Sequence, residues 1–192
     1  MLKNDVILKN TKDWIQNFII AFNLCPFASL SFDADTIDYK VVADSKFHDS
    51  MSALVDMITR LKSSSPKQIS NMFLIFNAEV DFQYLLDLEA SLDYAMEEAN
   101  ADRFFQTVVF HPEFRFDGEA HDSHGNFINR SPHPMIHILR TDEVSQAIEG
   151  HANIDEVPDR NKQILEHMYI DKIHVDPSPA LRISYDSFEG SR

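Results

Sequence analysis

Polar and titratable side chains crowd into residues 110–140, and this segment is where the sequence most plainly offers chemistry. It reads FHPEFRFDGEAHDSHGNFINRSPHPMIHILR. A loop of this length without secondary structure of its own is uncommon in a compact domain, and is usually functional or disordered. Apolar strand residues at both ends should hold this loop in place. We therefore expect an ordered loop that binds something.

Two histidines of this segment, His111 and His137, are candidates for moving a proton. A neutral imidazole can act as a general base, or it can orient a substrate through a hydrogen bond. His111 should end one strand and His137 should lie in the next, so antiparallel pairing of these strands would bring both to one sheet edge. The alternative for His111 is a structural role in which backbone groups of the loop satisfy the ring.

The run Asn129-Arg130-Ser131 presents an amide, a guanidinium and a hydroxyl in succession. Arginine binds a carboxylate or phosphate through two parallel hydrogen bonds, and Arg140 could complete such an anion pocket. The expected substrate-binding residues are Asn126, Asn129, Arg130, Ser131, Arg140 and Asp122. The alternative is that Arg130 locks the loop by pairing with an aspartate while Asn129 holds a turn.

Cys25 is the single thiol of the chain and a third catalytic candidate. It could act as a nucleophile with His111 or His137 as its base. A helix that begins at Pro26 would favour the thiolate, whereas a helix that ends at Cys25 would disfavour it. Free cysteine is among the most buried residue types, so a packed core thiol is the favoured alternative.

Metal and cofactor signals are weak. His121 and His124 lie near carboxylates and could suit zinc, but an HxxH spacing in a polar loop is not specific, so we predict no metal ligands. The sequence has no GxGxxG, no GxxxxGK[ST] and no CxxC, so the identity of any cofactor is unknown.

Composition narrows the class of protein. The chain has 192 residues, of which 44% are hydrophobic, and a formal net charge of −14. Such a charge argues against a nucleic-acid partner, because phosphate binding needs clustered Lys and Arg. One cysteine and the lack of a long apolar segment favour a cytoplasmic protein without a membrane anchor. The oligomeric state is not predicted.

Hydrophobic periodicity predicts the helices and strands that must position these residues. Apolar runs predict strands at 37–43, 71–77, 104–110 and 135–139. Helical spacing predicts helices from a cap at Asn10 or Thr11 to Pro26, and over 48–61, 81–100, 143–148 and 158–168. The continuous apolar run at 71–77 is typical of a strand that is buried on both faces.

The element order predicts the fold class. Strand–helix–strand units imply parallel pairing, although the third and fourth strands could pair antiparallel because a loop joins them. We expect residues 1–169 to form a single α/β domain with a mostly parallel sheet of about four or five strands and helices packed on its faces. Residues 170–192, with possible strands at 172–175 and 181–185, would form a docked or flexible C-terminal extension.

Several segments together carry a family resemblance: LCPFA at 24–28, QTVVFHPEFRF at 106–116, NRSP at 129–132 and VPDRNKQILEHM at 157–168. The chain resembles the bacterial domain-of-unknown-function family 1415 over roughly residues 10–168. The resemblance implies no activity, but it implies a shared site pattern. That pattern falls on Cys25, Pro26, His111, Pro112, Asp122, Asn126, Asn129 to Pro132, His137 and Arg140. His133 stands where the family has tyrosine, and His121 and His124 stand where it has no histidine.

The leading hypothesis is a small-molecule enzyme of the hydrolase or transferase type that acts on a carboxylate- or phosphate-bearing substrate. Arg130 would bind the anion, Asn129 would orient it, and His111 or His137 would move a proton. The alternatives are a non-catalytic binding or adaptor domain with a structural NRSP loop, and a metal-dependent hydrolase. The enzymatic hypothesis requires His111 and Arg130 to face a solvent-open cavity.

Overall fold

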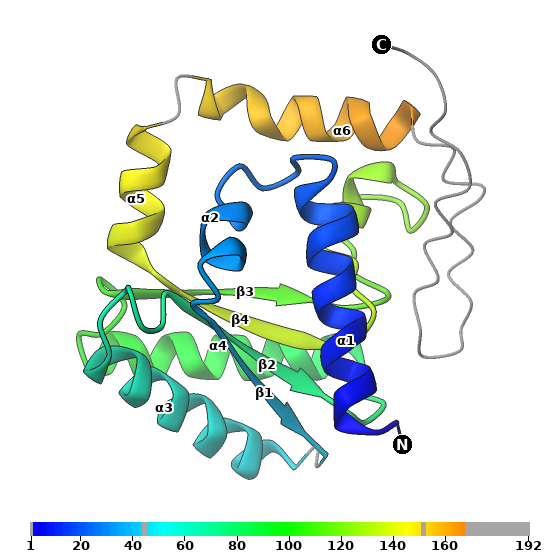
Figure 1. Cartoon of the computed structure of the whole chain (residues 1–192). Helices are drawn as coiled ribbons and strands as arrows, with labels where there is room; N and C mark the ends of the chain where they lie inside the picture. The colour runs from blue at the N-terminus through cyan, green and yellow to red at the C-terminus, as the bar shows by residue number, and fades with distance from the viewer. Residues whose placement is uncertain (1, 44–45, 151–152, 168–192) are drawn as a thin grey trace.

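A computed structural model describes residues 2–43, 46–150 and 153–167, and within these ranges the chain folds around a four-stranded sheet (Figure 1). The strands are β1 (Ile37–Val42), β2 (Asn71–Phe76), β3 (Phe105–Phe110) and β4 (Met135–Arg140). Their order across the sheet is β1-β2-β4-β3. All six residues of β2 are buried, which confirms the strand that was predicted to be covered on both faces.

The prediction of a mostly parallel sheet is wrong. β1 and β2 pair in parallel, whereas β4 pairs antiparallel with both β2 and β3. Three strands still run in one direction, as the connections through helices predict, but β4 inserts between β2 and β3 in the opposite direction. The antiparallel pairing expected for β3 and β4 is confirmed. The extension at 170–192, including its possible strands, lies outside the described residues.

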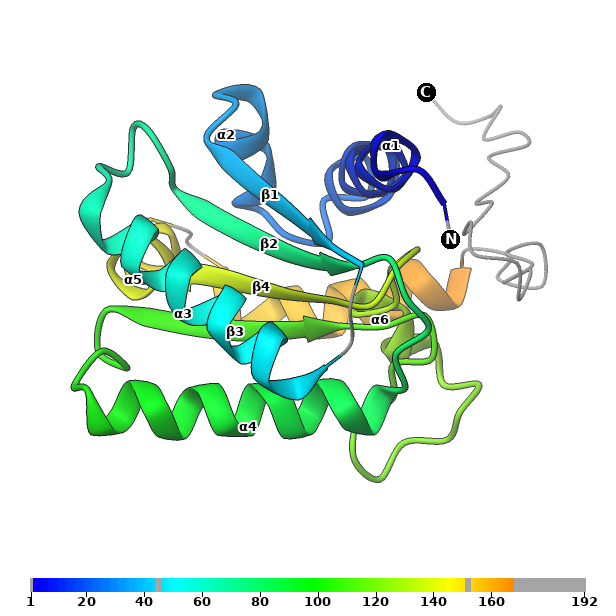
Figure 2. The ribbon, with the colours of Figure 1, turned by 90° about the horizontal axis from the view of Figure 1, so that it is seen from below.

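Two long helices, α3 (Phe47–Ser63) and α4 (Phe82–Glu98), cover one face of the sheet (Figure 2). Their apolar residues recur at helical spacing, and the Asp81 side chain caps α4 by accepting the Tyr84 N–H at 2.7 Å. The strand residues in this core include Met72, Leu74, Phe76, Val109, Ile136 and Ile138.

The other side of the sheet carries α1 (Asn4–Trp14), a π-helical turn η1 (Ile15–Ile20), α2 (Ala28–Asp33), α5 (Thr141–Glu149) and α6 (Val157–His167) (Figures 1 and 2). Its core includes Ile7, Trp14, Ile15 and Phe18 from the N-terminal helix, Phe73, Ile75 and Met135 from the strands, and Leu165 from α6. In the described residues, no helix is both long and apolar enough to cross a membrane.

The boundaries of the first helix differ from the prediction. The helix begins at Asn4, and Thr11 lies inside it, where its hydroxyl donates to the Ile7 carbonyl at 3.0 Å. The regular helix gives way to η1 at Ile15, and Asn23 then adopts a left-handed backbone conformation with φ of 51°. This turn redirects the chain before α2, so Leu24 is buried and Cys25 is exposed.

Candidate functional site

His111 is sealed inside the protein, with 4% of its surface exposed. Its Nε2–H donates to the Val80 carbonyl at 2.8 Å, and its Nδ1 accepts the Glu113 N–H at 3.0 Å. Burial lowers the pKa of the imidazole. Both ring nitrogens are satisfied by backbone groups. His111 thus has the structural role that was the alternative to general-base catalysis.

Arg130 is also enclosed, with 5% exposure. Its Nε donates to the Phe114 carbonyl at 3.2 Å, its Nη2 donates to the His121 carbonyl, and its guanidinium lies 4.5 Å from the ring centre of Phe127. Burial lowers the pKa of this arginine. These contacts fasten the loop to itself, through carbonyls rather than through an aspartate.

Two neighbouring polar residues of the loop, Asn126 and Ser131, are also buried and hydrogen-bonded within the protein, whereas Asp122 is not buried. Asn126 is fully buried, and its amide accepts the Phe116 N–H at 2.9 Å and donates to the Ala120 carbonyl at 2.8 Å. The Ser131 hydroxyl is buried and donates to the His133 carbonyl at 2.7 Å. Asp122 is exposed on the loop.

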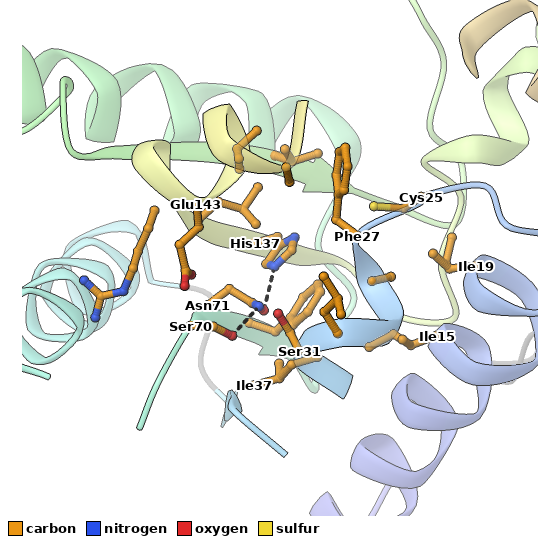
Figure 3. Close-up of a pocket in the computed structure, with 18 of the residues that line it drawn as sticks. Ile15, Ile19, Cys25, Phe27, Ser31, Ile37, Ser70, Asn71, His137 and Glu143 are labelled. Carbon is orange, nitrogen blue, oxygen red and sulfur yellow. Dashed lines mark hydrogen bonds between the residues drawn. The ribbon is translucent and has the colours of Figure 1, made fainter. Parts of the chain in front are cut away.

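A different region of the molecule is hollow. A cavity of about 640 Å³ lies against the sheet face opposite α3 and α4, bounded by the N-terminal helix, α2 and α5 (Figure 3). Its floor is formed by the strand residues Phe73, Val108, Phe110, His137 and Leu139. Four of the predicted site residues line it: Cys25, Asn129, His137 and Arg140. His111, Asp122, Asn126, Arg130 and Ser131 do not belong to the lining.

Strand register explains why the two candidate histidines do not meet. Phe110 pairs with Met135 and Val108 pairs with His137, so Val108 and Phe110 share the cavity face with His137. His111 continues the alternation of Val109 and therefore falls on the α4 side of the sheet. The requirement that His111 and Arg130 open into a cavity is not met.

The polar end of the cavity is a hydrogen-bonded chain. Nε2 of His137 lies 2.9 Å from Oδ1 of Asn71, and Nδ2 of Asn71 donates to the Ser70 hydroxyl at 2.9 Å (Figure 3). Ser70 in turn lies 2.9 Å from the Thr36 hydroxyl and donates to the Thr36 carbonyl at 3.3 Å. The His137 ring stacks flat on Phe73, with 3.9 Å between ring centres. Burial lowers the pKa of His137 to about 3, so the ring is neutral at pH 7.

Glu143 brings a carboxyl group to the same end of the cavity. It stands in the first turn of α5, and Figure 3 shows its side chain turned toward His137 and Asn71. Burial raises the pKa of this carboxyl group, and the charge of Arg140 acts in the opposite direction to a lesser extent. A partly desolvated carboxyl group is suited to proton transfer.

Arg140 and Asn129 line the cavity, but their donors are largely engaged. Arg140 donates from Nη2 to the Leu61 and Ser64 carbonyls at 2.6 and 2.8 Å, and from Nε to the Ile69 carbonyl at 3.2 Å. Asn129 donates from Nδ2 to the Val109 carbonyl at 3.2 Å. Arg140 therefore ties the turn after α3 to the end of β4, and Asn129 ties the loop to β3.

Cys25 stands at the rim of the cavity, just before α2 (Figure 3). The residue as a whole is exposed, so the packed core thiol favoured from the sequence does not form. The sulfur itself lies against the cavity wall, and this burial raises the pKa of the thiol, while the Phe27 and Ala28 N–H groups lower it to a lesser extent. Such a thiol is mostly protonated at neutral pH and is a slow nucleophile.

Sequence reasoning missed Asn71, Ser70, Ser31 and Glu143, all of which line the cavity. Asn71 carried a usable signal, because alternation along β2 places it on the same face as Phe73. Glu143 lies in the first turn of α5, the helix that follows directly after β4. Ser31 sits in a short helix that no pattern had singled out.

Within the described ranges, no group of three or more His, Cys, Asp and Glu side chains is arranged to hold a metal ion. His121 is exposed on the loop, and His124 begins the short 3-10 helix η2 (His124–Ile128). His133 is buried and lies 3.4 Å from the Asn10 amide nitrogen.

Comparison with known families gives a match over residues 6–174 to the model described as Protein of unknown function (DUF1415). The matched range is slightly longer than the resemblance seen in the sequence. Neither the curated proteins nor the solved structures contain a match to the chain.

Proposed function

The chain belongs to the DUF1415 family of proteins of unknown function, and from the site geometry we propose that it binds a small organic molecule in the cavity between the sheet, α2 and α5 and acts on it as an enzyme. The observation that carries this proposal is the cavity itself. Small-molecule sites are concave, largely apolar, and contain a few converging polar groups. A volume of about 640 Å³ with apolar walls and the His137–Asn71–Glu143 group at one end has these properties.

The division of roles follows from the partners of each group. His137 and Asn71 hold each other in place, so they would orient the ligand. Glu143 is the group in the cavity best suited to give or take a proton, because burial raises the pKa of its carboxyl group. Hydrolysis or group transfer needs such a group, and we favour these reactions over redox chemistry. We retain the cytoplasm as the proposed location, on the strength of the single cysteine.

Binding is tested with Nile red, a neutral apolar dye whose fluorescence rises in apolar surroundings. Ala147 lines the cavity from α5, and Ala147→Phe should fill part of the space. Ala90→Phe, on the exposed side of α4, is the matched control. We expect the wild type and the control to bind the dye and Ala147→Phe to lose it. Equal binding by all three would contradict the cavity as the site.

Turnover is tested with 4-nitrophenyl acetate in a Cys25→Ser background, which removes direct acylation of the thiol. Glu143→Gln should lower the hydrolysis rate by about 100-fold or more, as the loss of a general acid or base does. Glu149→Gln, on the exposed end of α5, should leave the rate unchanged.

A non-catalytic binding domain is the second candidate function, and a specific observation favours it. His111 and Arg130, the two polar residues first expected to act on a substrate, are satisfied by backbone groups. If Glu143→Gln and Glu149→Gln hydrolyse the ester equally while Nile red still binds, this alternative is preferred.

A further inference from the structure

The orientation of the His137 ring is fixed by a chain of hydrogen bonds that runs away from the cavity. The Ser70 hydroxyl donates to the Thr36 carbonyl, so it accepts from Nδ2 of Asn71. Oδ1 of Asn71 is therefore the atom that faces Nε2 of His137, at 2.9 Å. An amide oxygen only accepts, and Nε2 must carry the proton.

This arrangement leaves Nδ1 of His137 as a lone-pair acceptor. It has no hydrogen-bond partner among the residues that the structure describes. Nδ1 is not fully buried either. The fully buried side-chain atoms without a partner in the described residues are Trp14 Nε1, Thr141 Oγ1 and Arg160 Nε, and Nδ1 of His137 is not among them. The ring lines the cavity, its stacking on Phe73 fixes the ring plane, and a half-turn within that plane would break its bond to Asn71.

Glu143 and Arg140 are the charged groups at this end of the cavity. Glu143 contributes carboxyl oxygens. Arg140 spends its Nε and Nη2 donors on three backbone carbonyls. A carboxylate or phosphate at Nδ1 of His137 would meet a lone pair and the Glu143 carboxyl group, in a protein whose net charge is −14. Arg140 keeps its positive charge, but its Nε and Nη2 donors are directed at backbone carbonyls and not at this nitrogen.

We propose that the ligand is a neutral, largely apolar or aromatic molecule whose O–H or N–H group donates a hydrogen bond to Nδ1 of His137. This inference deepens the proposed function and rests on it. The apolar body would lie along Phe73, Phe110 and the N-terminal helix, and the donor group would point to the end where Glu143 and Asn71 stand. Because burial keeps the ring uncharged at neutral pH, His137 acts as an acceptor and not as a cation.

The test uses three naphthalene probes that share one apolar body. 2-Naphthol carries a donor, 2-methoxynaphthalene carries only an acceptor, and 2-naphthoate carries a negative charge. Each is titrated at pH 7 against the full chain by its displacement of Nile red. We expect 2-naphthol to bind about three- to tenfold more tightly than 2-methoxynaphthalene, as one additional hydrogen bond gives, and 2-naphthoate to bind most weakly.

The same titrations on His137→Phe identify the acceptor, because phenylalanine retains the flat contact with Phe73 but has no ring nitrogen. The preference for 2-naphthol should fall to about onefold. Glu143→Leu removes the other acceptor side chain at this end of the cavity and should retain the preference, since it leaves Nδ1 unchanged. A preference that survives in His137→Phe but disappears in Glu143→Leu would overturn the assignment to His137.

The wild-type titrations already test the ligand class, so the inference stands or falls even if His137→Phe does not fold. Tightest binding by 2-naphthoate, or equal binding by 2-naphthol and its methyl ether, would overturn it. If none of the three probes displaces Nile red, the proposed cavity site fails as a whole, and the two failures are thus distinguishable. Histidine ¹⁵N NMR gives an independent measurement: Nε2 of His137 should carry the proton, and the Nδ1 resonance should respond to 2-naphthol but not to the ether. An Nδ1–H tautomer would also overturn the inference.

Discussion

Acid should destabilise this protein steeply, because desolvated imidazoles, above all those of His133 and His137, stay neutral in the folded state. Burial lowers the pKa of His133 to about 4 and that of His137 to about 3, from an ordinary value of 6.5. Below pH 6.5 the unfolded chain binds protons that the folded chain does not. The contribution of these two histidines to the free energy of unfolding is therefore fully present above pH 6.5. It is lost as the pH decreases toward 4 for His133 and toward 3 for His137.

The size of the effect follows from proton linkage. At pH 5 each imidazole is almost fully protonated when unfolded and almost fully neutral when folded, which removes about 2 kcal/mol for each residue relative to pH 8. Together they remove about 4 kcal/mol from a free energy of unfolding that is typically about 5–15 kcal/mol. The net charge of −14 acts in the opposite direction, since protonation relieves self-repulsion. A free energy of unfolding that falls with decreasing pH therefore indicates that the histidines dominate, and one that rises indicates that relief of self-repulsion dominates.

Urea unfolding at pH 8, 7, 6 and 5 measures this dependence, with the single Trp14 as the fluorescent reporter. His133→Gln and His137→Gln should each reduce the loss between pH 8 and pH 5 by about 2 kcal/mol. His48→Gln, on the exposed surface of α3, is the control and should leave the loss unchanged. An unchanged pH dependence in both of the first two variants would refute the reasoning.

Further predictions concern the loop and the thiol. Arg130→Met should lower the free energy of unfolding by about 2–4 kcal/mol, because it leaves buried carbonyls unpaired, yet it should not alter Nile red affinity. Asn126→Ala should cost about 2–3 kcal/mol in urea unfolding, whereas Asp122→Ala on the exposed part of the same loop should cost less than about 0.5 kcal/mol. Cys25→Ser should change the stability by less than about 0.5 kcal/mol, and Nile red should slow the reaction of the wild-type thiol with 5,5′-dithiobis(2-nitrobenzoate), followed at 412 nm.

Much of the fold could be predicted from periodicity. The apolar run of β2 and the apolar stripes of α3 and α4 identify these elements, because a strand in the middle of a sheet and helices on one face have distinct patterns. The place of β4 in the sheet could not be predicted. Local sequence determines that β3 and β4 are strands, but the insertion of β4 between β2 and β3 depends on contacts between distant segments.

The candidate site shows the same division between local and distant information. Alternation correctly groups Val109 with His111, and Met135 with His137. Whether these two groups share a face depends on the register between β3 and β4, and a shift of one residue reverses the answer. The long loop between the strands conceals that register, so the sequence alone could not exclude a meeting of the two histidines.

The density of polar residues in the loop has its own physical cause. A long segment without a β ladder must still satisfy its buried N–H and C=O groups. Arg130, Asn126 and His111 do this by bonding to carbonyls and N–H groups of the loop and its neighbours. A cluster of polar side chains in such a loop therefore indicates a structural role as readily as a ligand site, and the two cannot be told apart by composition.

The more informative sign is a polar atom that the fold positions firmly and leaves without a partner. Nδ1 of His137 is such an atom among the described residues, since Asn71 fixes the ring on one edge and Phe73 supports it from one face. Such an acceptor, held in one direction at the wall of an apolar cavity, is ready to accept a hydrogen bond from a ligand without first giving up a bond to the protein. A free acceptor in this position is expected where a ligand supplies the donor. Whether a hydroxyl group on the ligand improves binding at Nδ1 of His137 therefore distinguishes a binding cavity from a packing defect.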